Sequence, residues 1–124
     1  MSIKQEFTRI IKQLAIDENA NFHENEDYFE TSPLIQAEIE LFTRNLEETI
    51  AYLDNECTEY EFEWLSEVFE EISLKLDSME FIDALMRTAQ RFPDGEQKFY
   101  PLIDLASCNL SDEVYNDYFD DNEE

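Results

Sequence analysis

The fold is decided by residues 58–76, which read TEYEFEWLSEVFEEISLKL. Thr58 and Glu61 have the spacing of a capping box, in which the threonine hydroxyl and the glutamate carboxylate each accept a backbone N–H of the other residue. The apolar residues behind this box step by three and four, as one helix face requires. They are Phe62, Leu65, Phe69, Ile72 and Leu76. The stretch therefore predicts one helix with a continuous seam, and Trp64, on another side, is either a core aromatic or an anchor for a partner.

Similar signals on both sides of this stretch predict further helices. Ser2 can cap a helix over residues 3–16, and an acidic stretch over residues 17–30 is typical of a loop. Serine followed by proline favours a helix start at residues 32–33, since proline at the first helical position loses no hydrogen bond. The remaining start signals are Asn45, Ser78 and Ser111, and the apolar residues of segment 99–105 suggest one more packed element.

Helices of this length joined by short turns favour antiparallel neighbours. We expect an all-α fold, a compact helical bundle or a short stack of antiparallel helical hairpins with about six helices. Residues 1–119 would form a single helical domain, with residues 120–124 as a frayed acidic tail. One glycine and three prolines leave few of the turns that an all-β protein needs.

The charge of the chain is strongly one-sided. Its 32 Asp and Glu residues outnumber eight Lys and Arg, which gives a formal net charge of −24. High charge with few apolar residues indicates disorder, but 43% of this chain is hydrophobic and 14% is aromatic. We therefore expect an ordered core beneath a surface that attracts cationic partners and repels nucleic acid and anionic lipid.

The side chains that catalysis most often uses are scarce. His23 is the sole histidine, Gly95 is the sole glycine, and Cys57 and Cys108 fit neither a disulfide framework nor a metal motif. We expect no catalytic residue, no cofactor and no metal site, and hence a protein that is not an enzyme. The first residues carry no apolar leader, and no apolar run reaches membrane-spanning length, which favours the cytoplasm.

Acidic side chains gather outside the apolar seam of residues 58–76. Neighbouring carboxylates on a helix repel one another, and few lysines are interspersed to offset this. A solvated face is the plain alternative, but solubility alone needs far less charge. We expect the negative surplus to be concentrated as a binding face for a cationic partner. The candidate contact residues are Glu59, Glu63, Glu67, Glu70 and Glu71, with the loop acids Glu24, Glu26, Asp27 and Glu30.

The middle of the chain resembles a known class of protein over residues 34–93. The resemblance rests on Leu46-Glu47-Glu48-Thr49-Ile50, Tyr52-Leu53-Asp54-Asn55, Cys57-Thr58, the run from Phe62 to Glu71, and Glu80-Phe81-Ile82. This aromatic and acidic pattern is similar to that of small acidic bacterial immunity proteins of polymorphic toxin systems, including contact-dependent growth inhibition. It implies a cytoplasmic protein that binds the C-terminal domain of a cognate toxin, frequently a nuclease that cuts RNA or tRNA, and it implies no individual contact residues.

Three functions fit the charge and the predicted fold. The leading hypothesis is an immunity protein that neutralises a basic nuclease by acidic occlusion of its active site. A DNA-mimic inhibitor of a DNA-binding protein would instead space its acids like phosphates along an elongated surface. A helical adaptor or chaperone would bind through an apolar groove, and its binding would survive high salt.

Overall fold

The computed structural model describes residues 2–21 and 33–114. Within these ranges the chain forms seven helices and no strand, which confirms the all-α prediction. The helices are α1 (Ile3–Asn21), α3 (Pro33–Thr43), α4 (Leu46–Asn55), α5 (Glu59–Ser66), α6 (Phe69–Leu76), α7 (Met79–Gln90) and α8 (Gly95–Ser107). Residues 112–114 are also helical, as the start signal at Ser111 predicts.

Most of the predicted helix starts are confirmed. Ser2 accepts a hydrogen bond from the Gln5 N–H at 3.2 Å, and Asn45 accepts one from the Glu48 N–H at 3.0 Å. Thr58 and Glu61 make both bonds of the capping box. Ser78 occupies the N-cap position of α7 but makes no capping bond with its side chain.

Two predicted boundaries are wrong. Helix α1 continues to Asn21, past the predicted end at residue 16, because neither glycine nor proline interrupts residues 17–21. The predicted single helix of residues 59–76 is instead two helices, α5 and α6, which also raises the helix count above six. At the break Val68 leaves the helical region, with φ −124° and ψ 16°. This change of backbone direction allows Val68 to be buried together with Leu65 before it and Phe69 after it.

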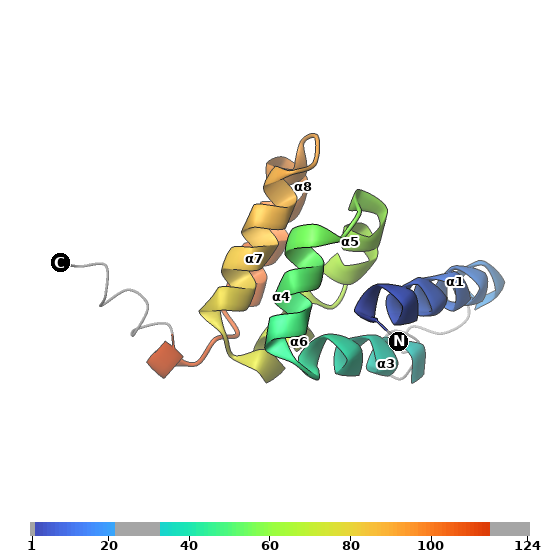
Figure 1. The fold of residues 1–124 in the computed structure, drawn as a ribbon, viewed down its shortest axis with the longest axis horizontal. Coiled ribbons are helices and arrows are strands. Elements are labelled where there is room, and N and C mark those ends of the chain that lie inside the picture. The colour runs from blue at the N-terminus through green and yellow to red at the C-terminus, as the bar shows by residue number, and fades with distance from the viewer. Residues whose placement is uncertain (1, 22–32, 115–124) are drawn as a thin grey trace.

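The helices form a layered arrangement around one core (Figure 1). Helices α7 and α8 form an antiparallel hairpin, with α4 against α7 and α6 against α8. Helices α1 and α3 pack on each other and extend to the other side of α4, while α3 also contacts α6. The α3–α6 contact matters for the site, because it brings together two segments that are about thirty residues apart in sequence.

Two aromatic clusters anchor the core. Phe7, Phe42 and Tyr52 join α1, α3 and α4, with the two phenylalanine rings 4.8 Å apart. Phe62 joins α5 to Phe69 of α6 and Phe99 of α8, with centroids 5.1 and 4.6 Å away. Edge-to-face contacts of this kind add stabilisation beyond the apolar area that they bury. In α8, however, Leu102 and Leu105 are exposed, so that predicted packed segment presents only part of its apolar residues to the core.

Candidate functional site

The break between α5 and α6 divides the predicted acidic face into two groups. On α5, Glu59 and Glu63 point toward α8, where the Lys98 Nζ lies 3.6 Å from a Glu59 carboxylate oxygen and 3.4 Å from one of Glu63. These two carboxylates raise the pKa of the exposed Lys98 ammonium. Glu59 and Glu63 are therefore part of a surface ion-pair cluster, and such a cluster contributes little to stability.

The second group lies at the break and on α6. Glu67 is exposed, Glu71 is half-buried, and the charges of both act on Glu38 of α3. Glu70 is exposed, and its backbone carbonyl accepts a hydrogen bond from the Asn109 amide at 2.9 Å. Of the five predicted acids, the structure thus brings Glu67 and Glu71 together around a third acid that the sequence prediction did not include.

Glu38 is the most unusual of the described acids. Its side chain is 0% exposed, and neither carboxyl oxygen has a hydrogen-bond partner. Burial, together with the nearby carboxylates of Glu67 and Glu71, raises its pKa from an ordinary 4.5 to about 8. One Glu71 oxygen, Oε2, is likewise buried without a hydrogen-bond partner. We call Glu38, Glu67 and Glu71 the acid cluster.

Glu61 shows how this fold satisfies a buried acid. Its carboxylate accepts the Tyr52 hydroxyl at 2.6 Å and the Lys4 ammonium at 3.0 Å, and it completes the capping box with the Thr58 N–H at 3.4 Å. Burial and this contact raise the pKa of Tyr52, which keeps its hydroxyl protonated as a donor. Glu61 is thus a structural acid, and Glu38 lacks every one of these contacts.

Sequence reasoning missed Glu38 although a signal was present. Glu38 lies three residues after Ile35 and four before Phe42, on the buried stripe of α3. An acid within an apolar stripe is the pattern that marks a buried carboxyl group. The charge excess of the whole chain obscured this position, because acids are common everywhere else.

The loop acids Glu24, Glu26, Asp27 and Glu30 lie outside the described residues. Among the described acids, the expected concentration on residues 58–76 is not found. Exposed carboxylates occur on every helix from α3 to α8, for example Glu40, Glu47, Glu63, Glu80 and Glu96. The negative surface is therefore broad, and the acid cluster is distinguished by its burial.

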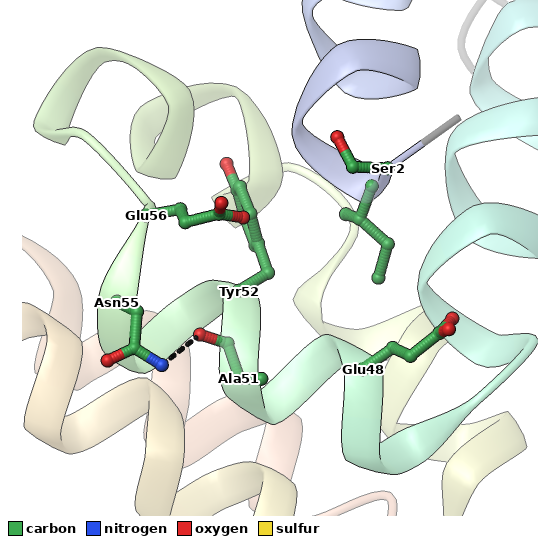
Figure 2. A pocket seen from close by; sticks show the side chains of 7 residues that line it. Ser2, Glu48, Ala51, Tyr52, Asn55 and Glu56 are labelled. Atoms are coloured by element: carbon green, nitrogen blue, oxygen red, sulfur yellow. Dashed lines mark hydrogen bonds between the residues drawn. The ribbon is translucent and has the colours of Figure 1, made fainter.

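A pocket of about 320 Å³ opens between the start of α1 and helix α4 (Figure 2). It is lined by Ser2, Ile3, Glu48, Ala51, Tyr52, Asn55 and Glu56. The Asn55 amide is already used, since it donates to the Ala51 carbonyl at 2.9 Å. Its lining combines apolar side chains such as Ile3 and Ala51 with the exposed Glu48 and Glu56.

A larger groove of about 520 Å³ runs between α1 and α5. Its walls are mainly apolar, and Ile16 and Tyr60 stand at its edge with 60% and 58% of their surface exposed. Trp64, by contrast, is half-buried and packs against the core, so the core interpretation of this residue fits the structure.

In residues 2–21 and 33–114, no three side chains of the metal-ligating types are arranged to hold a metal ion. The described helices also include none with the length and apolar character needed to cross a membrane. No family model matches the chain, and no curated protein and no solved structure is found to be similar to it.

Proposed function

We propose that this chain is a cytoplasmic immunity protein that binds and neutralises the toxin domain of a cognate effector, a cationic nuclease acting on RNA. The observation that supports this most directly is the charge of −24 on an ordered helical scaffold, with exposed carboxylates on every helix from α3 to α8. Eight bases cannot compensate 32 acids however they are paired.

The chemistry of such a partner explains why the surface is acidic. A nuclease must hold phosphates in a cationic groove. A carboxylate-rich surface competes for that groove and covers the active site without any chemistry of its own. Opposite potentials also steer the two proteins together, with association rates of up to about 10⁸–10⁹ M⁻¹s⁻¹ at low salt. Fast capture is useful because the toxin must be bound before it cuts its substrate.

Exposed charge pairs alone do not give tight binding, because each one contributes about 0–1 kcal/mol. Affinity needs a few groups that become desolvated at the centre of the interface. The region of α5 and α6, where α6 meets α3, combines the exposed Glu63, Glu67 and Glu70 with Glu38 of α3, a carboxyl group that the fold has already desolvated. We therefore place the partner on this side of the molecule.

Co-expression tests the function. The chain is produced in cells together with the toxin domain encoded immediately upstream of its gene. We expect survival and a complex that elutes as one peak on a sizing column. If the cells die as readily as without the chain, and no complex forms, the proposed function is wrong.

Charge reversal tests the location of the interface. The double variant Glu63→Lys and Glu70→Lys changes exposed acids of α5 and α6, while Glu80→Lys with Glu96→Lys makes the same charge change on α7 and α8. We expect the first pair to abolish protection and the second pair to retain most of it. Equal loss in both variants would show that net charge, and not this face, determines binding.

The groove between α1 and α5 supports a second candidate, a helical adaptor that binds an apolar segment of a partner. The exposed Ile16 and Tyr60 at its edge are the observation that favours it. Binding in this groove would persist at about 0.5 M salt, whereas charge-steered association slows steeply as the ionic strength rises. Replacing Tyr60 with Ala would weaken adaptor binding and leave toxin neutralisation unchanged.

A further inference from the structure

The acid cluster contains carboxyl oxygens that the described fold leaves unsatisfied. Both oxygens of Glu38 and Oε2 of Glu71 are buried without a hydrogen-bond partner. A buried polar group without a partner loses its hydrogen bonds to water without gaining others, and so it destabilises the fold. A leucine would fill a similar space without an unsatisfied polar group. An unsatisfied group in an otherwise well-packed position calls for an explanation, and a role in binding is one that fits an acidic surface.

The three side chains of the cluster differ in exposure in an ordered way. Glu67 is exposed, Glu71 is half-buried and Glu38 is buried. The charges of Glu67 and Glu71 act on Glu38, and α3, which carries Glu38, packs against α6, which carries Glu71. The cluster thus includes one acid at the surface, one that is half-buried, and one that is fully buried.

Carboxyl oxygens accept hydrogen bonds, and ionised carboxylates attract positive charge, so a cationic N–H donor suits all three members of the cluster. A metal ion does not fit, since the described residues contain no three suitable side chains in a metal-binding arrangement. A guanidinium or ammonium group fits, because it presents several N–H donors and an aliphatic stem that can pass between half-buried side chains. No basic residue of the described chain fills this role for Glu38.

We propose that Glu38, Glu67 and Glu71 form the receptor for one arginine or lysine side chain of the partner, with Glu38 at its inner end. This inference rests on the proposed function and names the desolvated anchor that its affinity requires. The incoming side chain passes Glu67 at the surface, and Glu71 and Glu38 then accept its hydrogen bonds. A charge-assisted contact of this kind, away from water, is stronger than the exposed pairs around it.

Binding at this site also moves a proton. The charged groups that act on Glu38 among the described residues are Glu67 and Glu71, both carboxylates, and together with burial they hold its pKa near 8. Free Glu38 is therefore mostly protonated at pH 7. A cation favours the ionised carboxylate, so the proton leaves Glu38 for the buffer as the basic side chain enters. By linkage, affinity must rise with pH until Glu38 is ionised in the free protein as well.

A hexa-arginine peptide serves as the probe in a test on the full chain. Carbon-detected NMR of the labelled protein follows the side-chain carboxyl carbon of Glu38 through a pH titration, at low salt, with and without the peptide. We expect saturating peptide to lower the pKa of Glu38 by at least about one unit, which corresponds to a tenfold coupling. An unchanged Glu38 titration at saturation overturns the proposal.

Matched variants separate the cluster from general charge attraction. Glu38→Gln and Glu40→Gln each remove one carboxylate from α3, but Glu40 is exposed. We expect Glu38→Gln to weaken peptide binding about fivefold at pH 8, which is close to 1 kcal/mol, and Glu40→Gln to weaken it less than twofold. Equal losses in the two variants, or a Glu38 titration that responds to calcium chloride and not to the peptide, also overturn the proposal.

This experiment contains no toxin, so its outcome is independent of the co-expression test. If the peptide lowers the pKa of Glu38 while co-expression fails to protect cells, the receptor site stands and the proposed partner is wrong. If co-expression protects cells while Glu38 is unaffected by the peptide, the function stands and the anchor lies elsewhere.

Discussion

The buried carboxyl group of Glu38 makes the stability of the folded chain depend on pH. Its pKa is about 8 in the fold and close to 4.5 when exposed. Below pH 4.5 Glu38 is protonated in both the folded and the unfolded chain. The fold then buries a neutral group, and the contribution of this protonation to the free energy of unfolding is fully present. As the pH rises toward 8, the unfolded chain gives up its proton first, so the free energy of unfolding falls by roughly 1.4 kcal/mol per pH unit.

We therefore expect Glu38→Gln to flatten this loss. Urea unfolding at pH 5 and at pH 8 measures the free energy of unfolding of both chains. Between these pH values the original chain should lose on the order of 3–5 kcal/mol more of this free energy than the variant does. Glu40→Gln on the same helix is the control and should keep the original pH dependence. A Glu38→Gln chain with an unchanged slope would show that this carboxyl group is not protonated in the fold.

Gly95 is a second position where one atom decides stability. A Cβ built there lies 1.9 Å from the Ala89 carbonyl oxygen, at the turn between α7 and α8. This contact is with backbone, which cannot move aside as a flexible side chain can. We expect Gly95→Ala to destabilise the fold by about 1–3 kcal/mol, read as a fall in Tm by circular dichroism. Asp104→Ala, on the exposed side of α8, should change Tm little.

At the scale of elements, the two N-caps of α5 and α7 form a matched pair. Thr58 accepts the Glu61 N–H at 3.2 Å, while Ser78 caps α7 without a side-chain bond. We expect Thr58→Ala to cost about 0.5–2 kcal/mol of unfolding free energy in denaturant titrations, and Ser78→Ala to cost less than about 0.5. Equal costs would mean that backbone conformation, and not the hydroxyl, determines the effect at both positions.

Most helices could be predicted because their signals are local. Capping residues such as Ser2, Asn45 and Thr58 act within one turn, and apolar spacing identifies the buried face. The break at Val68 could not be predicted, because no glycine or proline marks it. It arises from tertiary packing, in which the N–H of Val68 bonds to the Leu65 carbonyl at 2.9 Å and its side chain enters the core.

The candidate site was predicted only in part for the same reason. Glu67 and Glu71 are recognisable as acids outside the apolar seam. Their proximity to Glu38 depends on the packing of α3 against α6, which joins distant parts of the sequence. The position of Glu38 on the apolar stripe of α3 is a local sign of its burial, but nothing local in the sequence shows which distant acids it meets.

For the whole molecule, the negative surplus opposes the compact state. Salt screens this repulsion, with a Debye length that falls from about 30 Å at 0.01 M to about 10 Å at 0.1 M. We therefore expect Tm to rise when sodium chloride is increased across that range, by several degrees, as followed by circular dichroism. The same concentration of sucrose in place of salt is the control. A Tm that is constant or falls with salt would contradict the idea that charge repulsion limits stability.

The two cysteines have opposite environments, and this has a practical consequence. Cys57 is buried, and burial raises its pKa to about 12, whereas Cys108 at the end of α8 is exposed. Thiol reagents react with the accessible thiolate, so a maleimide dye should attach to Cys108 alone in the folded chain and give a single adduct by mass spectrometry. The native sequence thereby carries its own fluorescent reporter position beside Asn109, whose amide bonds to the Glu70 carbonyl of α6, so a dye there would report on binding near this helix without any substitution.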